Sequence, residues 1–180
     1  VAAEKTARIT DFLVACKSST TLEPAVDEVV VMAERAARDN QFRLAHELLT
    51  TAERHAKRVS AVKVTKALNE VRGGVRGREQ AFASLTSAQR TLMDKPDDPK
   101  ANLAAGQWFA IYESNWEQAL PKLKQGSDAK WKSAAELDSK ATDEIENQLA
   151  AADAWWEVSQ AATGAAKPYP GIKNHAHCPV

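Results

Sequence analysis

At 180 residues, the chain is long enough for one domain, or two small helical units, that buries most of its apolar surface. Lys and Arg together number 24, as do Asp and Glu, so the chain lacks the positive excess with which proteins bind a phosphate backbone, and we expect no nucleic-acid partner. No apolar stretch approaches the roughly 20 residues that cross a bilayer, so we also expect no membrane insertion.

Helical periodicity predicts an all-α chain without strands. The expected helices span about residues 3–17, 23–39, 41–57, 60–94, 99–113, 115–125, 128–139 and 143–163. The strongest boundary lies in "DKPDDPK", where Asp98 caps a helix and Pro99 takes its first position. We therefore expect one helical domain over residues 1–164, made of sub-units at about 1–95 and 98–164.

The longest expected helix carries a heptad stripe of apolar side chains. Its members are Val64, Leu68, Val71, Val75, Phe82, Leu85 and Leu92, with Arg78 and Gln89 in the two remaining places. Because only four to five heptads are available and two places are polar, the stripe favours packing within the domain over an intermolecular coiled coil. Gly73, Gly74 and Gly77 each cost a helix about 1 kcal/mol relative to Ala, which predicts a kink or a break there.

Two stretches of the chain share one spacing of apolar residues: "DNQFRLAHELLTTA" (39–52) and "ESNWEQALPKLKQG" (113–126). The aligned pairs are Phe42 with Trp116, Ala45 with Ala119, Leu49 with Leu123, and Ala52 with Gly126. Steps of three and four place these positions on one helical face, with an aromatic wedge at its start and small residues where two backbones approach. We expect Trp116→Ala to be costly, at about 3 to 5 kcal/mol, and Trp131→Ala to be mild.

Upstream of the second stretch, Gly106 and Phe109 in "LAAGQWFAIY" supply a small residue and an aromatic three positions apart on the partner helix. This arrangement resembles the tetratricopeptide (TPR) helix-turn-helix. The resemblance implies a TPR-like stack of antiparallel helices forming an α-α superhelix. A third half-unit, "AAADAWWEVSQAA", is followed by a segment that cannot supply a second helix.

Residues 4–163 also resemble a helical region of large, uncharacterised proteins from planctomycete bacteria. The stretches that carry the resemblance are "DDPKANLAAGQWFAIYESNWEQALPKLKQGSD", "KSAAELDSKA" and "DAWWEVSQ". Relatives commonly carry an export signal ahead of this region, sometimes with further modules, and no activity is assigned to the helical part. The resemblance implies a non-catalytic scaffold or protein-interaction module of a larger, exported or periplasmic protein, whose partners are another protein or other modules of the same polypeptide.

Few residues in the sequence suggest chemistry. His175, His177 and Cys178 are donors suited to zinc or copper, but they lie in a Pro- and Gly-bearing segment, residues 165–180, for which we expect an irregular tail without a metal site. His46 and His55 have no Cys or Ser in a nucleophile-base frame, so we expect solvated or capping residues. The sequence therefore predicts no catalytic residue, no cofactor and no metal.

Two groups of side chains are candidates for binding. Trp131 and Trp156 are expected at the surface, as contacts for a partner or, alternatively, for a carbohydrate or another ligand. Residues 54–78 hold eight Lys or Arg against Glu70 alone, which indicates either a solvated face or a face for an anionic partner. The residues of the second interpretation are Arg54, Lys57, Arg58, Lys63 and Lys66.

Overall fold

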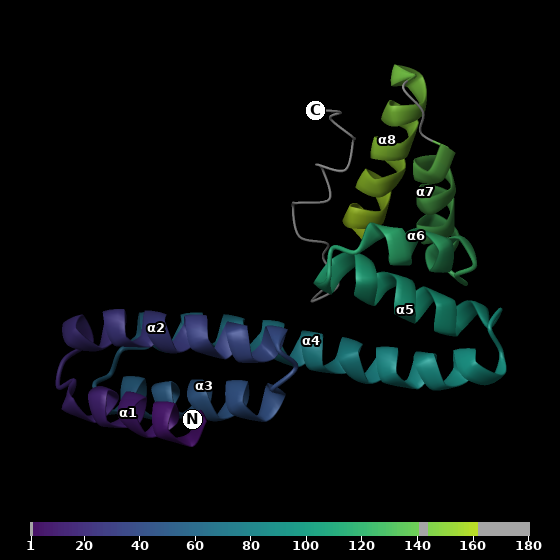
Figure 1. The fold of residues 1–180 in the computed structure, drawn as a ribbon. Coiled ribbons are helices and arrows are strands. Elements are labelled where there is room, and N and C mark those ends of the chain that lie inside the picture. Colours follow the sequence, from purple (N-terminus) through teal and green to yellow (C-terminus); the bar gives the residue numbers. More distant parts are fainter. Residues whose placement is uncertain (1, 141–143, 162–180) are drawn as a thin grey trace. The chain divides into compact units, whose positions relative to one another are not determined.

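The structure is a computed structural model that describes residues 2–140 and 144–161; the expected tail at 165–180 lies outside these residues. The described residues form helices and no strand (Figure 1). The helices are α1 (Ala2–Ala15), α2 (Ser19–Arg38), α3 (Phe42–Arg58), α4 (Val62–Asp94), α5 (Pro99–Tyr112), α6 (Trp116–Lys124), α7 (Ala129–Lys140) and α8 (Ile145–Ala161). The predicted all-α class is confirmed, and each expected helix is present.

The start of α2 differs most from its expected place. It begins at Ser19 rather than near residue 23, because Ser18 and Thr21 form a reciprocal capping box ahead of it. The Ser18 hydroxyl accepts the Thr21 backbone N–H at 3.3 Å, and the Thr21 hydroxyl accepts the Ser18 N–H at 3.4 Å. These bonds satisfy N–H groups that a helix start would otherwise leave without a partner.

The chain divides into two compact units, unit 1 (Val1–Glu79) and unit 2 (Gln80–Val180), so the boundary lies inside α4. This division lies before the sub-unit boundary that we expected at about residues 95–98. The reason is that Leu85 packs with Ala105 and Trp108 of α5, which places the second half of α4 in unit 2. Of the kink or break expected at the three glycines, the break is absent, since α4 is one helix from Val62 to Asp94.

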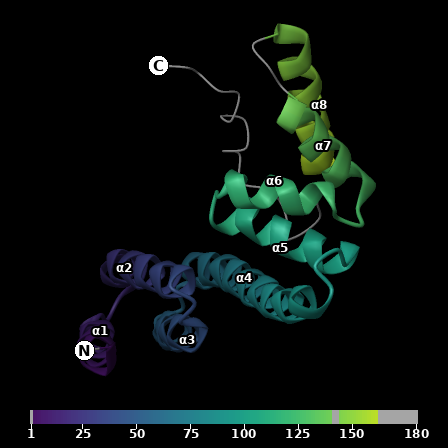
Figure 2. The same cartoon turned by 45° about the vertical axis from the view of Figure 1, so that its right-hand side comes forward.

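In unit 1, α2 packs along α3, and α1 packs against both (Figure 2). The first part of α4 is joined to α3 by an ion pair between Arg72 and Glu53 at 2.7 Å. His46 of α3 also contacts Glu79 of α4, with 2.9 Å between the imidazole Nε2 and the carboxylate. Val64, Leu68 and Val75 of the heptad stripe are buried, as expected for a seam within the domain.

Two arginines close the ends of helices in unit 1. Arg58 donates from Nη2 to the carbonyl oxygens of Leu13, Val14 and Cys16 at 3.0 to 3.4 Å, at the end of α1. Arg78 donates to the carbonyl oxygens of Ala37 and Arg38 at 2.9 and 3.2 Å, at the end of α2. A guanidinium here satisfies terminal carbonyl groups and opposes the negative end of the helix dipole. Arg78, one of the two polar residues within the heptad stripe, therefore has a structural role.

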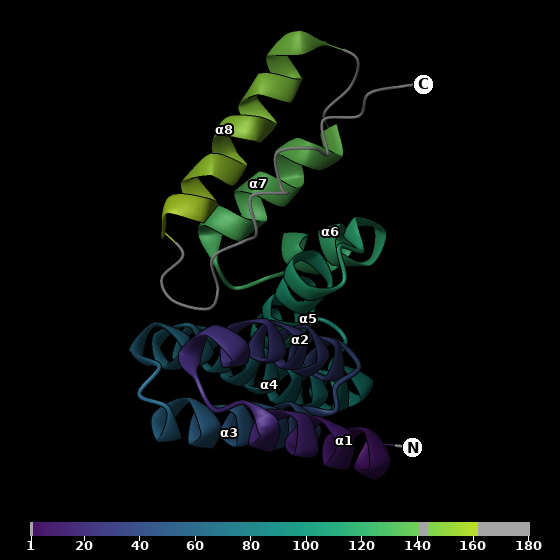
Figure 3. The same cartoon turned by 90° about the vertical axis from the view of Figure 1, so that its left-hand side faces the viewer.

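Unit 2 is built from helix pairs that bury aromatic side chains. The helices α5 and α6 pack together, α6 packs on α7, and α7 runs along α8 (Figure 3). The Trp155 ring lies edge-on to the Trp116 ring at 5.1 Å and to the Trp131 ring at 5.7 Å, measured between ring centroids. Such edge-to-face pairs add stability beyond the apolar area that they bury.

Three turns between helices share a left-handed residue: Asn40 (φ 58°), Ser60 (φ 55°) and Ser114 (φ 51°). After the first, the Gln41 N–H donates to the Ala36 carbonyl at 2.8 Å; after the second, the Ala61 N–H donates to the Ala56 carbonyl at 2.9 Å. This is the bond that closes a helix in a Schellman motif. Asn40 and Ser114 hold the same place in the two aligned stretches of sequence, so the shared spacing extends to the backbone.

Replacing Gly73 or Gly74 with Ala should stabilise unit 1. Both glycines are exposed, and a Cβ at either position would meet no atom of the described chain beyond its own helix within 4 Å. Each substitution removes a helix penalty of about 1 kcal/mol, so each should raise the free energy of unfolding by up to that amount. Urea unfolding followed by far-ultraviolet circular dichroism measures the change. A loss of stability would contradict the conclusion that a methyl group fits at these two positions without a clash.

Candidate functional site

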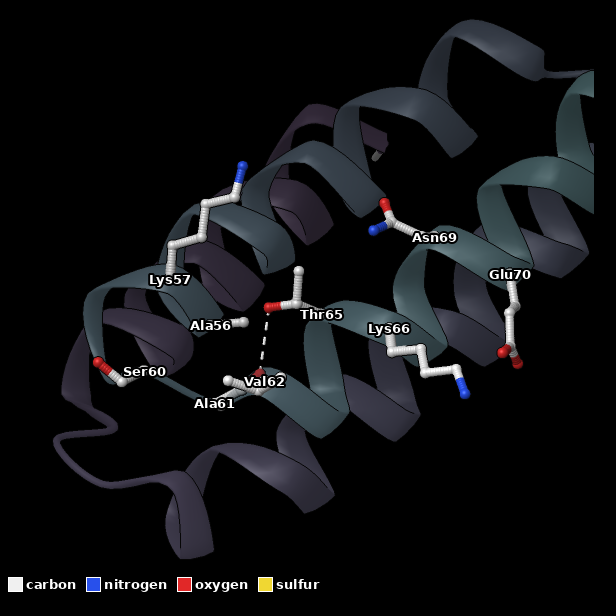
Figure 4. A pocket seen from close by; sticks show the side chains of 9 residues that line it. All are labelled: Ala56, Lys57, Ser60, Ala61, Val62, Thr65, Lys66, Asn69 and Glu70. Carbon is white, nitrogen blue, oxygen red and sulfur yellow. Dashed lines mark hydrogen bonds between the residues drawn. The ribbon is translucent and has the colours of Figure 1, made fainter.

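A pocket lies where α3 turns into α4 in unit 1, with a volume of about 740 Å³ (Figure 4). Its lining residues come from the end of α3, the turn and the start of α4: Ala56, Lys57, Ser60, Ala61, Val62, Thr65, Lys66, Asn69 and Glu70. The Thr65 hydroxyl is turned back along the helix, where it donates to the Ala61 carbonyl at 3.1 Å. The pocket therefore combines apolar Ala and Val side chains with two ammonium groups and one carboxylate.

The pocket occupies a face that the aligned stretches fill with core residues. Counted from the left-handed turn residue, the second, fifth and ninth positions in α3 are Phe42, Ala45 and Leu49, which are all buried. After the third of these turns, at Ser114, the corresponding positions are Trp116, Ala119 and Leu123, which belong to or pack on a core cluster. At the start of α4 the same count gives Val62, Thr65 and Asn69.

These three α4 residues line the pocket, and Val62 is 78% exposed. The start of α4 instead buries the neighbouring positions, Val64 and Leu68. A shift of one residue turns a helix by about 100°, so the face with the shared spacing is turned away from the core of unit 1. The pocket is thus an exposed counterpart of the packing face that α3 and α6 bury.

The basic residues of this region divide into two groups. Lys57 and Arg72 both pair with Glu53 at 2.7 Å, and these contacts, that of Lys57 first, hold the pKa of Glu53 below its usual value. Arg58 is occupied at the end of α1. Two of the five residues expected to form an anion-binding face, Lys57 and Arg58, therefore have partners within the chain.

The other three members of the expected face, Arg54, Lys63 and Lys66, are exposed. Lys66 lines the pocket, and Lys63 lies three residues before it, on the same side of α4. Arg54 precedes Lys57 by three residues on α3, which also places these two side chains on one side of their helix. Positive charge therefore flanks the pocket from both helices, with Glu70 as the acidic member of the lining.

His55 precedes the pocket residue Ala56 on α3 and is buried, with 7% of its surface exposed, so the expectation of a solvated side chain is wrong. Its Nδ1 atom has no hydrogen-bond partner among the described residues. Burial lowers the pKa of His55 below its usual value, and the charges of Arg58 and Arg54 act in the same direction. Burial and the two neighbouring guanidinium groups therefore disfavour the protonated form of this imidazole.

The stability of unit 1 should fall as the pH drops below about 6.5, where a histidine of the unfolded chain takes up its proton. The folded state accepts this proton only at lower pH, since the folded pKa of His55 is depressed. The contribution of His55 to the stability of unit 1 is thus fully present above the pKa of the unfolded chain, and it is lost as the pH falls toward the lower pKa of the folded state. In His55→Leu this part of the pH dependence should disappear. The test is the unfolding free energy of the unaltered chain and of His55→Leu, measured on both sides of about pH 6.5. The same pH dependence in both proteins would contradict this prediction.

Of the two tryptophans expected at the surface, one is buried. Trp131 is 6% exposed and belongs to the core cluster with Leu123 and Trp155, so its expected role as a surface contact is wrong. The reason is that Trp131, Ala134 and Ala135, at steps of three and four, form one buried face of α7. Because two of these three residues are alanines, the apolar pattern of this face is weak in the sequence. Trp156 is 54% exposed, as expected, but it does not line the pocket.

The metal candidates of the sequence, His175, His177 and Cys178, lie outside the described residues. Within residues 2–140 and 144–161, no three His, Cys, Asp or Glu side chains gather where they could hold a metal ion. None of the described helices combines the length and apolarity needed to cross a membrane.

Comparisons of the chain with protein-family models, with curated proteins and with solved structures gave no match. The resemblances inferred from the sequence therefore remain expectations about fold and function. The residues of the pocket and the charges around it provide the physical basis for a functional proposal.

Proposed function

We propose that this chain is a non-catalytic protein-interaction or scaffold module of a larger protein, and that the pocket between α3 and α4 binds an acidic segment of a protein partner. The observation that carries the proposal is the coincidence of this pocket with the exposed basic side chains Arg54, Lys63 and Lys66. Charge of this kind steers an acidic partner toward the site and fixes its orientation.

The lining indicates what the bound segment would contain. Val62, which is 78% exposed, offers an apolar surface to one anchoring side chain, and the lining also includes the buried Ala56 and Ala61. Lys66 stands on α4 beside this surface, where a carboxylate of the partner can pair with its ammonium group. A segment with one apolar residue flanked by Asp or Glu therefore fits the pocket better than a purely acidic one.

The same proposal includes a TPR-like stack of antiparallel helices. Its support is the recurrence of one turn and one packing frame at Asn40 and at Ser114, each followed by a buried alanine, Ala45 or Ala119. Such helix pairs expose their ends and faces to partners, which is why repeats of this type serve as scaffolds. The resemblance to exported planctomycete proteins would place the module in a larger polypeptide.

The alternative, a carbohydrate- or ligand-binding domain that uses surface tryptophans, has less support. It required two exposed rings, and Trp131 is part of the core. Trp156 alone would stack on one sugar ring, and it does not line the pocket at the α3–α4 turn.

Replacing Arg54, Lys63 and Lys66 with Glu should reduce binding of an acidic peptide with a single central Leu by about tenfold or more. The matched control is the triple exchange of Arg90, Lys95 and Lys100 for Glu, which changes the net charge equally at exposed positions of unit 2. Fluorescence anisotropy of a labelled peptide measures both, at low and moderate salt. Equal losses in the two triple variants would mean that only net charge matters and would reject the site. A second peptide with Ser in place of Leu tests the apolar anchor.

A further inference from the structure

The last described helix carries a second apolar face besides the one in the core. Ala151, Trp155 and Val158 of α8 are buried against the rest of unit 2. Ile145, Leu149 and Trp156 are 73%, 59% and 54% exposed, and Ala152 lies among them. At 100° per residue these four side chains fall within about 60° of one another, roughly 120° around the helix from the buried face. They are called the outer stripe of α8.

Charge is distributed unevenly beside the outer stripe. Glu146, Asp153 and Glu157 are exposed and fall within about 40° of one another on the helix, next to the stripe on one side. No Lys or Arg occurs between Ile145 and Ala161. The outer stripe thus has an acidic edge, and its complement is a segment that is apolar and basic. A second copy of α8 would bring the same acidic charges together, which disfavours self-association through this face.

We propose that the outer stripe is covered by the chain's own following segment, residues 165–180, with Tyr169 and Ile172 on the stripe and Lys167 and Lys173 along the acidic edge. This segment holds two Lys and no Asp or Glu, so its charge matches that of the edge. Its apolar pair, Tyr169 and Ile172, lies between the two lysines, which suits an apolar stripe with a charged border. The inference is independent of the proposed function, which rests on unit 1.

The length of the chain permits this contact. From Ala161, the end of α8, back to Trp156 is roughly 8 Å along the helix axis, and back to Ile145 is roughly 24 Å, at about 1.5 Å per residue. An extended chain covers up to roughly 3.5 Å per residue, so the eleven residues from 161 to 172 span as much as roughly 38 Å. Even after reversing direction, the segment reaches every turn of the stripe. The tether also keeps the segment at a high effective concentration beside α8.

Acrylamide quenching of Trp156 fluorescence in the full chain tests this contact. The Trp156 signal is isolated as the difference between the chain and its Trp156→Phe variant. Replacing Tyr169 and Ile172 together with Ser should raise the quenching of Trp156 about twofold, because the ring loses its cover. Asn174→Ser, a matched change in the same segment, should leave it unchanged. Lys173→Glu should also raise quenching, and Glu157→Lys combined with it should restore the original value.

Two outcomes would overturn the proposal. Strong quenching of Trp156 in the unaltered chain, unaffected by any of these changes, would mean that the stripe is open to a separate partner. Weak quenching of Trp156 that rises on dilution, but does not change when Tyr169 and Ile172 are replaced, would mean that a second copy of the chain covers the outer stripe. Circular dichroism of each variant verifies that helicity is retained, since all the altered side chains lie on exposed α8 positions or beyond the helix.

Discussion

Trp131→Ala should lower the free energy of unfolding of unit 2 by about 3 to 5 kcal/mol. The ring is 6% exposed and contacts the Trp155 ring edge-on at 5.7 Å, in a cluster that also holds Leu123 and Ala134. Its removal would leave a cavity between α6, α7 and α8 that these packed helices cannot close. This reverses the mild effect that the sequence alone led us to expect.

The measurement is urea unfolding followed by tryptophan fluorescence, which reports on unit 2 because all five tryptophans lie there. Met93→Ala is the matched control, since Met93 belongs to the same unit and is 81% exposed; it should change stability by at most about 0.5 kcal/mol. For Trp116→Ala, the loss in the free energy of unfolding should lie between those of the other two variants, because the Trp116 ring is only half-buried. Similar small losses for Trp131→Ala and Met93→Ala would show that the Trp131 ring is not a core residue.

Leu123→Ala and Gly106→Ala should each destabilise unit 2, and together they should partly compensate. Leu123 is fully buried, so its truncation should cost about 2 to 5 kcal/mol. A Cβ at Gly106 would lie 2.7 Å from two carbons of the Leu123 side chain and 3.1 Å from its backbone nitrogen. The overlap involves more than the tip of a flexible side chain, so the cost of overpacking should exceed what Ala gains over Gly in helix propensity. The free energy of unfolding should therefore fall by about 1 to 2 kcal/mol.

In the double variant the shortened residue 123 makes room for the new methyl group. The loss should therefore be smaller than the sum of the two single losses by about 1 kcal/mol or more. Gly73→Ala, the same exchange on an open helix face, provides the contrast, because it should stabilise the chain. Strict additivity of the Gly106 and Leu123 changes would mean that α5 and α6 do not approach closely at this point.

The helices could be predicted because their signals are local. Asp98 accepts the Ala101 N–H at 2.9 Å, as a capping residue before Pro99 should, and the apolar steps of three and four continue through each helix. The aligned frame around Ala45 and Ala119 was visible for the same reason. Both alanines are fully buried.

What the sequence did not reveal depends on partners far away along the chain. Arg58 reaches α1 across more than forty residues, and Arg78 does the same to α2, so neither could be recognised as a capping side chain. The burial of His55 depends on the packing of other helices, and a buried imidazole looks like a solvated one in sequence. The pocket, too, arises from the rotation of α4 by about one residue, which periodicity alone does not fix.

The continuity of α4 affects how the two units unfold. A linker between domains is ordinarily an exposed, irregular segment, which proteases cut and which lets each domain melt alone. Here the boundary at Glu79 and Gln80 is hydrogen-bonded helix, and each unit uses part of α4 as one of its own packed elements. If either unit unfolds, its part of α4 loses its packing partners, and a helix without them is marginal in water. Fraying that starts in one unit can thus spread along the shared helix into the part of α4 that belongs to the other unit.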